Sequence, residues 1–249
     1  MIQPGVRPHA TIPALRIAVM IPALDEEAAL PTVLADLARV ALAPGATLTQ
    51  VIVADNGSLD RTAEAAHAGG ATVVREPRRG YGAACLAALA SLPADACDVV
   101  AFLDADGSDD VADLAAVLAP IVAGEADLVV GSRALGQAER GSLTPVQRFG
   151  NWLAAALLRG LFGARVTDLG PLRAIRRRAL DSLCMRDRDY GWTVEMQARA
   201  LRAGLRYREV PARYRRRRGG RSKVAGTLRG AAGAGWKILW TIARVRLGG

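Results

Sequence analysis

Five short apolar segments, each followed by a stretch with helical patterning, constrain the fold of this chain more than any other feature. They cover residues 16–24, 49–58, 71–77, 97–107 and 126–133. Apolar runs of this length, separated by helices, are typical of buried strands in a parallel sheet that helices cover on both faces. The sequence therefore predicts an α/β fold with a mainly parallel sheet.

The rest of the chain reads as helices and as a less regular carboxyl-terminal part. Thr144 is a predicted N-cap, because Pro145 follows it in the first turn of an amphipathic pattern. Residues 166–180 read as part loop and part strand, and residues 205–218 as a strand pair interrupted at Pro211. The expected helices are residues 25–42, 59–70, 80–92, 109–124, 144–163 and 190–204.

Charge is distributed unevenly along the 249 residues. Residues 1–172 hold 12 basic and 19 acidic side chains, a net charge of −7, whereas residues 173–249 hold 21 and 5, a net charge of +16. The basic third is expected to face phosphate, anionic lipid or nucleic acid. The chain divides into a flexible segment 1–15, one domain over 16–225 and an amphipathic helix over 226–249.

Cysteine spacing and hydropathy bear on where the chain resides. Cys85, Cys97 and Cys184 have neither metal nor disulfide spacing, which favours reduced cytosolic thiols. The start of the chain does not resemble a signal peptide, and no apolar run reaches the ~18–20 residues needed to span a bilayer. We expect a cytoplasmic protein that is soluble or peripheral at the membrane.

Four carboxylates crowd the end of the fourth strand in the sequence FLDADGSDD, at Asp104, Asp106, Asp109 and Asp110. Positions i and i+2 of an extended segment point to the same side, so Asp104 and Asp106 are expected to act together. Two carboxylates without Cys or His favour a hard divalent ion, Mg²⁺ or Mn²⁺. The alternative is helix capping, which we expect of Asp109 or Asp110.

Two further polar clusters follow the first and second strands. In VADNGSLDRT, Asn56 and its neighbours suit a turn and a helix cap, but Asp55 is free to contact a ligand. In IPALDEE, Asp25 and Glu26 suit either the start of a helix or a binding site. Because ligands of parallel sheets bind at the carboxyl ends of the strands, these clusters predict one common site there.

The order of these pieces resembles glycosyltransferase family 2. The pieces are IPALDEE, VADNGSLDRT, GYGAA, FLDADGSDD, VVGSR, DLGPLRAIRR, GWTVEMQARA and RRGGRSK, and they span about residues 16–225. Within the family the chain is most similar to the dolichyl- and polyprenyl-phosphate mannosyl- or glucosyltransferases. The resemblance implies a GT-A fold, which is a single α/β domain that binds a nucleotide-sugar and one divalent metal ion.

The resemblance also implies roles for individual residues. Asp104 and Asp106 would hold the metal on the donor diphosphate, Arg133 and Arg148 would bind an acceptor phosphate, and Asp106 and Arg133 would be catalytic. Asp168, the one acid in an otherwise basic neighbourhood, is a further catalytic candidate. The nucleotide-sugar would contact Pro22, Ala23, Asp25, Glu26, Asp55, Asn56, Asp104, Arg218, Ser222 and Lys223.

The chain departs from the family pattern at several of these places. It has Leu24-Asp25 where relatives usually have Tyr-Asn, and Asn56 where they have a second Asp. Ser108 stands near the place of a missing Gln, and the sequence around Asp168 differs from the usual Ser-Gly-Phe type. These differences leave the identity of the nucleotide and of the acceptor open.

The expected reaction is metal-dependent, inverting transfer of a hexose from GDP-mannose or UDP-glucose to polyprenyl phosphate. A phosphate monoester has a second pKa near ~6, so it needs positive residues rather than a base. Asp168 would be a base only if the acceptor were an alcohol, and its alternative is a loop or cap residue. A soluble phosphorylated acid or a sugar hydroxyl remains an alternative acceptor.

A different class of function, nucleic-acid binding, is suggested by the basic tail. Few aromatic residues and an acidic first half disfavour it, so we expect no nucleic-acid partner. The helix over 226–249 places apolar residues on one face and polar residues on a narrow second face, which suits either a membrane interface rich in anionic lipid or packing on a protein. The apolar face of this helix holds Trp236, Leu239, Trp240, Ala243 and Leu247, and its polar face holds Lys237, Thr241 and Arg244.

The sequence leaves the oligomeric state open, and a homodimer is one of the alternatives.

Overall fold

One sheet organises the chain, and the computed structural model describes residues 14–219 and 228–248 of it. Within this part seven strands have the order β3-β2-β1-β4-β6-β5-β7. Strand β6 runs antiparallel to its neighbours β4 and β5, and the other pairings are parallel. The mainly parallel sheet is therefore confirmed. The strands are β1 (Leu15–Ala23), β2 (Ala46–Asp55), β3 (Thr72–Arg75), β4 (Val99–Phe102), β5 (Leu128–Ala138), β6 (Arg173–Arg176) and β7 (Tyr207–Tyr214).

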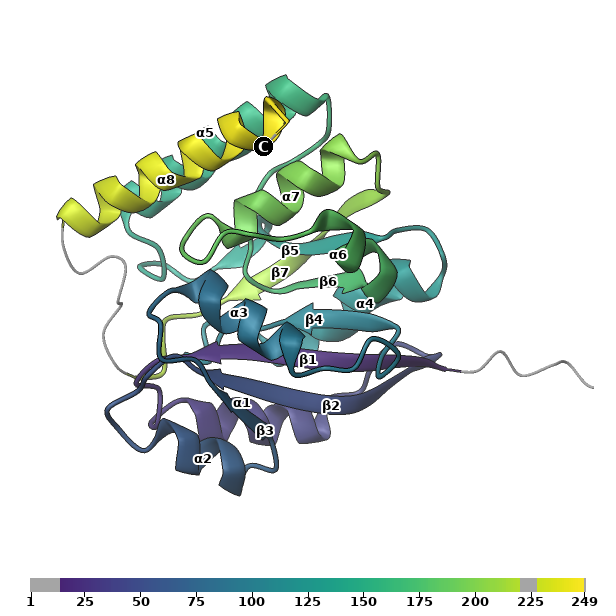
Figure 1. Cartoon of the computed structure of the whole chain (residues 1–249), viewed down its shortest axis with the longest axis vertical. Helices are drawn as coiled ribbons and strands as arrows, with labels where there is room; N and C mark the ends of the chain where they lie inside the picture. The colour runs from purple at the N-terminus through teal and green to yellow at the C-terminus, as the bar shows by residue number, and fades with distance from the viewer. Residues whose placement is uncertain (1–13, 220–227, 249) are drawn as a thin grey trace, which may run out of the picture.

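Helices cover both faces of this sheet, as predicted (Figure 1). Helices α1, α2 and α4 pack on one face, and α3, α6 and α7 pack on the other. A one-turn 3-10 helix, Val111–Asp113, leads into α4. The helices are α1 (Leu30–Arg39), α2 (Thr62–Ala68), α3 (Tyr81–Ala90), α4 (Leu114–Val122), α5 (Pro145–Phe162), α6 (Arg177–Leu183), α7 (Trp192–Arg202) and α8 (Leu228–Arg246).

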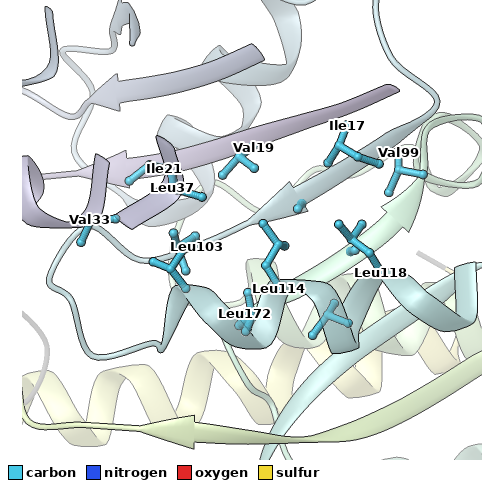
Figure 2. Packing of buried hydrophobic residues seen from close by; sticks show 14 of the residues in the cluster. Ile17, Val19, Ile21, Val33, Leu37, Val99, Leu103, Leu114, Leu118 and Leu172 are labelled. Carbon is cyan, nitrogen blue, oxygen red and sulfur yellow. The ribbon is translucent and has the colours of Figure 1, made fainter. Parts of the chain in front are cut away.

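The central strand β1 shows how the sequence builds two cores at once. Alternate side chains of a strand point to opposite faces. Ile17, Val19 and Ile21 join the core under α1 and α4, which Figure 2 shows at close range. Ala18 and Met20 join the core under α3 and α7. All five are fully buried, so the continuous apolar run of β1 reflects a strand covered on both sides.

Helices α5 and α8 form an outer layer on the α7 side of the sheet (Figure 1). Leu158 of α5, Val194 and Ala198 of α7, and Ile242 and Val245 of α8 share a third apolar core. The capping prediction for α5 is confirmed, because Gln147 donates its amide to Thr144 Oγ1 and the Gln147 side chain accepts the Thr144 amide. The helix expected over residues 226–249 is found as α8.

The first helix begins five residues later than its sequence predicts. Asp25, Glu26 and Glu27 precede α1, which starts at Leu30 with Pro31 in its first turn. A proline suits that position because the amide it lacks has no partner within the helix. The acidic residues are thereby left in a loop at the end of β1, where their backbone and side chains are free of helical geometry.

Two expectations about strands were also wrong. Residues 205–218 do not form a strand pair, because Tyr207–Tyr214 is a single strand that continues through Pro211. Strand β7 is an edge strand, and its register with β5 shifts just after Pro211, which is where a residue without an amide is tolerated. Strand β4 ends at Phe102, so Asp106 lies in a turn and not in extended backbone.

Candidate active site

A cavity of about 630 Å³ opens beyond the carboxyl ends of β1, β2 and β4. This is the edge of the sheet at which the sequence predicts a common site. Most of the residues expected to bind a nucleotide-sugar meet there, although they come from three separate loops. The cavity is lined by Pro22, Ala23, Leu24, Asp25, Glu26, Asn56, Arg79, Gly80, Tyr81, Ala84, Asp104, Ala105, Asp106, Asp189, Tyr190 and Arg217.

The loop after β1 is fixed by hydrogen bonds to the loop after β2. Asp25 adopts a left-handed backbone conformation, with φ of 51°. Its amide donates to Ser58 Oγ at 3.0 Å, and its carboxylate accepts the amide of Leu59 at 2.8 Å. The amide of Glu26 donates to Thr62 Oγ1 at 2.8 Å. These bonds hold the Asp25–Glu26 segment as a rigid wall of the cavity.

Asp55 and Asn56 stand side by side but differ in what they contact. The Asp55 carboxylate accepts the amide of Ser58 at 2.9 Å, and Asp55 is not part of the cavity lining. The Asn56 side chain donates to the carbonyls of Glu76 and Arg78 and accepts the amide of Gly80 at 2.8 Å. Asn56 therefore fastens the loop before α3, which explains the amide at a place where the family pattern has a carboxylate.

Asp104 and Asp106 both reach the cavity, as predicted. Tyr81 donates its hydroxyl to Asp104 Oδ1 at 3.2 Å, and the amide of Ser108 donates to Asp106 Oδ1 at 2.8 Å. Burial and then the charge of Asp106 raise the pKa of Asp104 to about 7. Removal of the Asp104 carboxylate from water is the larger cause of this shift, and repulsion by the neighbouring carboxylate adds to it.

Asp109 and Asp110 have different environments. Asp109 is buried and accepts the amide of Asp104 at 3.3 Å, and burial together with Asp104 and Asp106 raises its pKa well above the usual range. Asp110 accepts the amide of Ala112 at 3.2 Å and so begins the 3-10 helix before α4. The capping alternative is therefore confirmed for Asp110.

Much of the arginine run after β7 pairs with these acidic residues and does not extend into solvent. Arg215 lies 2.6 Å from Asp110, and Arg213 lies 3.1 Å from Asp110 and 2.9 Å from Asp113. The uneven charge of the chain thus has an internal explanation, because the basic third covers the acidic edge of the sheet. The expectation that this third faces external anions needs correction for these arginines.

Within that run the residue that enters the cavity is Arg217. Its Nη1 lies 2.9 Å from Asp106 Oδ2, and its Nη2 bonds Glu26. Arg218, to which the family resemblance gave the phosphate contact, instead lies 3.6 Å from Asp36 of α1. Ser222 and Lys223 were assigned the same role and lie outside the described residues.

Arg133 and Asp168 form a buried ion pair beside the acidic cluster. Asp168 accepts from Arg133 Nε at 2.8 Å, from its Nη2 at 2.6 Å and from its amide at 2.6 Å. The guanidinium also lies over the ring of Tyr214, 4.9 Å from its centre. Burial lowers the pKa of Arg133, but the hydrogen bonds and charge of Asp168 outweigh this effect and raise it overall. Both oxygens of Asp168 are thus engaged in holding Arg133.

Neither Arg133 nor Arg148 is part of the cavity lining. Arg148 lies in the first turns of α5, where its side chain is exposed. Its assignment to an acceptor phosphate stays a prediction. Arg133 is the better placed of the two, because its charge lowers the pKa of Asp104 and of Asp109, which shows that it lies near the acidic cluster.

The donor set of the cavity fits a hard divalent ion. Asp104 and Asp106 offer carboxylate oxygens, while Cys and His are absent from the cavity lining. In the part of the chain that the structure describes, no group of three or more His, Cys, Asp or Glu side chains is arranged to hold a metal. A Mg²⁺ or Mn²⁺ ion held by two carboxylates completes its shell with water and substrate phosphate oxygens, so two ligands suffice.

The parallel sheet, the cavity at its carboxyl edge and the carboxylate pair define a GT-A-type glycosyltransferase. The chain belongs to Glycosyl transferase family 2, which matches residues 18–184. The expected fold and the expectation of an enzyme are thus confirmed. An uncharacterized glycosyltransferase of Mycobacterium tuberculosis is 40% identical, over 90% of this chain and 97% of that protein.

Two further relatives differ in their acceptors. A dolichyl-phosphate hexose transferase of Haloferax volcanii is 34% identical, over 82% of this chain and 84% of that protein. Glucosyl-3-phosphoglycerate synthase from Mycobacterium tuberculosis, solved with phosphoglyceric acid, is 25% identical with a TM-score of 0.73, covering 93% of this chain and 80% of that chain. A structure of the same synthase with Mn²⁺, uridine diphosphate and glucosyl-3-phosphoglycerate is 24% identical, with a TM-score of 0.72 and the same coverage.

Three features of the site were missed from the sequence. Tyr81 lies in the GYGAA piece, and that piece gives no indication of a role for the Tyr81 hydroxyl. Arg217 is one of four consecutive arginines, among which sequence alone gives no reason to prefer one. Asp189 and Tyr190 line the cavity from a segment that carries no motif of its own.

None of the described helices is both long and apolar enough to cross a bilayer.

Proposed function

We propose that this chain transfers a hexose, with inversion, from GDP-mannose or UDP-glucose to the phosphate of a polyprenyl phosphate. The observation that carries the proposal is the carboxylate pair Asp104 and Asp106, which faces a large cavity next to a buried, fixed Arg133. The pair suits a divalent ion bound to the diphosphate of the donor, and the arginine suits the phosphate of the acceptor. The similarity to the dolichyl-phosphate hexose transferase of Haloferax volcanii supports the choice of acceptor.

On the donor side, the residues at the carboxyl edge hold the leaving group. Asp106, with Asp104, would hold a Mg²⁺ or Mn²⁺ ion, and such an ion supplies a Lewis acid that stabilises the negative charge developing on the diphosphate. The Mn²⁺ complex of the synthase from Mycobacterium tuberculosis is consistent with this assignment. Arg217 adds a fixed positive charge at the same place, and its guanidinium donates to phosphate oxygens bidentately.

On the acceptor side, Arg133 positions the nucleophile. A phosphate monoester is largely dianionic at neutral pH, so its oxygen attacks without a general base. Two of the five N–H donors of Arg133 bond Asp168, and the others remain to bind phosphate. In this account Asp168 is a positioning residue that fixes Arg133, which differs from the role of base that an alcohol acceptor would require.

The outer surface of helices α5 and α8 supports an acceptor that lies in a membrane. On α5, Phe149 is 61% exposed and Trp152 is 58% exposed, and on α8, Trp236 is 72% exposed and Trp240 is 55% exposed. The two helices pack side by side (Figure 1), and each carries two of these exposed aromatic side chains. Aromatic residues on amphipathic helices insert at the level of lipid headgroups, which suits a protein peripheral to the cytoplasmic face.

A soluble phosphorylated acid is the second candidate acceptor. The observation in its favour is the fold of glucosyl-3-phosphoglycerate synthase, which covers 93% of this chain and was solved with phosphoglyceric acid. The same Arg133 would bind the phosphate of that acid. The two candidates therefore share the donor chemistry and differ only in what carries the acceptor phosphate.

Labelled donor distinguishes them directly. The protein is incubated with Mn²⁺ and either radiolabelled GDP-mannose or UDP-glucose, and with either polyprenyl phosphate in vesicles or 3-phosphoglyceric acid. We expect label to enter the organic phase in the vesicle reaction with the wild-type protein. With an Asp106→Asn variant, the label should stay in the unreacted donor. Label that appears only in an aqueous product of 3-phosphoglyceric acid would replace the lipid acceptor with the soluble one.

A further inference from the structure

The loop between α6 and α7 contributes to the wall of the cavity and contacts α8. We call residues 186–190 the wall loop. Asp189 and Tyr190 line the cavity from this loop. Asp187, between them and α6, faces the other way into the protein and is buried. A carboxylate taken out of water needs charged and hydrogen-bonding partners, and α8 supplies them.

Asp187 joins the wall loop to the middle of α8. Its carboxylate lies 3.3 Å from Lys237 Nζ and accepts the hydroxyl of Thr241 at 3.4 Å, while its own side chain is 0% exposed. The same carboxylate accepts the amide of Asp189 at 2.8 Å. The Asp187 side chain therefore contacts both Lys237 of α8 and a residue that lines the cavity. A methyl group at Gly191 would lie 2.4 Å from Asp187 Oδ2, which shows how closely these parts pack.

Glu195 of α7 makes a second connection of the same kind. Its Oε2 accepts the amides of Arg186 at 3.0 Å and of Asp187 at 2.7 Å, which fixes the start of the wall loop. Its Oε1 lies 3.1 Å from Arg244, one turn further along α8 than Thr241. The Glu195 side chain is fully buried as well. Two buried carboxylates thus tie one loop to two basic residues of one helix.

On its other side the wall loop packs against the start of α3. The carbonyl of Arg188 accepts the amide of Ala83 at 2.9 Å. A Cβ at Gly80 would lie 2.1 Å from that carbonyl, and a Cβ at Gly82 would lie 2.1 Å from the carbonyl of Asp187. Only glycine permits this approach, and Tyr81 lies between the two glycines. Tyr81 is the residue that donates to Asp104, so the wall loop borders the carboxylate pair.

We propose that Asp187 and Glu195 are positioning residues through which α8 fixes the wall of the donor cavity. The proposal rests on the proposed function only in assigning that cavity to the donor. When Lys237 and Arg244 occupy their places, the wall loop holds Asp189, Tyr190 and the start of α3 in the geometry that binds the donor. Trp236 and Trp240 of the same helix are exposed.

A pair of substitutions at one position tests the connection. Lys237 is 38% exposed, and Met keeps helix propensity and length, so Lys237→Met removes the charge without a cavity in a core. We expect it to raise the donor KM and the dissociation constant of the nucleoside diphosphate roughly tenfold, equivalent to about 1.4 kcal/mol. We expect kcat to stay within about twofold, because the metal ligands are unchanged. Lys237→Arg should restore both constants.

Controls separate positioning from a general loss of structure. Arg208→Met removes an exposed ion pair with Glu125 elsewhere and should leave the donor KM unchanged. The double variant Lys237→Met with Asp187→Asn should bind more tightly than Lys237→Met alone, because no unpaired charge remains buried. Melting temperatures of all variants show that they are folded.

Two results would overturn the proposal. One is a donor KM for Lys237→Met equal to that of the wild type, and the other is the same increase in KM for Arg208→Met. Titration with the nucleoside diphosphate measures donor-site binding without turnover and so tests the wall loop separately from transfer. If the wild-type protein bound the diphosphate but transferred no sugar to either acceptor, the proposed function would be wrong. The role of the wall loop would still be decided by the dissociation constants of the variants.

Discussion

Arg217 Nη1 lies 2.9 Å from Asp106 Oδ2, and the same guanidinium bonds Glu26 at the end of the neighbouring strand. One side chain thus bridges the loops after β1 and β4 across the cavity. In the protein without a cation, Arg217 supplies the positive charge that the acidic cluster requires. A metal held by Asp106 would place the donor diphosphate in the cavity that Arg217 also lines.

We predict that Arg217→Met lowers kcat/KM for the donor roughly a hundredfold or more, the usual cost of removing one fixed charge from a transition state. Steady-state rates with saturating acceptor measure it. Arg218→Met is the matched control, because Arg218 lies one residue away and contacts Asp36 on α1. Equal losses in the two variants would show that the run of arginines acts by net charge and not by position.

We predict that Mn²⁺ raises the melting temperature of the wild type but not that of Asp106→Asn. At a concentration one hundred times its dissociation constant, a ligand that binds the native state adds about 2.7 kcal/mol of stability. Removing the metal with a chelator should reverse the increase. An increase of the same size in Asp106→Asn would place the ion elsewhere.

We predict that Asp168→Asn raises the KM of the acceptor roughly tenfold or more, with a smaller change in kcat. A hydrogen bond to a charged group is worth about 1.5–3 kcal/mol, and its loss leaves Arg133 less firmly held. Arg133→Lys should behave alike, since an ammonium cannot bond both oxygens of Asp168 in one plane. A complete loss of kcat in Asp168→Asn, with an unchanged acceptor KM, would instead indicate a general base.

We predict that Trp236→Ser combined with Trp240→Ser weakens binding to anionic lipid vesicles roughly tenfold or more, because burial of each ring contributes about 1.5–3 kcal/mol. Sedimentation with vesicles measures it. Leu59→Ser, which alters an exposed apolar side chain far from α8 in the sequence, is the control. Vesicle binding that survives the double substitution would remove α8 from the membrane surface.

The strands and the site edge could be predicted because their signals are local. A run such as residues 16–24 must be buried on both faces, and the polar residues that follow it must then lie at the carboxyl edge. The sequence also predicts caps at Thr144 and at Asp109 or Asp110, because a cap depends on residues within one turn. These parts of the fold follow from short-range physics.

The parts that could not be predicted depend on tertiary contacts. Asp25–Glu27 have a composition suited to a helix start, but bonds to Ser58 in the loop after β2 and to Thr62 at the start of α2 hold them out of it. Which arginine enters the cavity depends on the register of β7 against β5, and that register shifts after Pro211. The link between Asp187 and Lys237 joins positions fifty residues apart in sequence, and neither has a local signal.

The most direct test of the account is the position of manganese in a complex with the nucleoside diphosphate. Anomalous scattering at the manganese edge locates the ion independently of how the rest of the complex is interpreted. The account predicts a peak bound by Asp106, with Asp104 coordinating it directly or through water, and diphosphate oxygens completing its shell. A peak elsewhere in the cavity, or diphosphate bound equally well with no ion beside these two carboxylates, would contradict it.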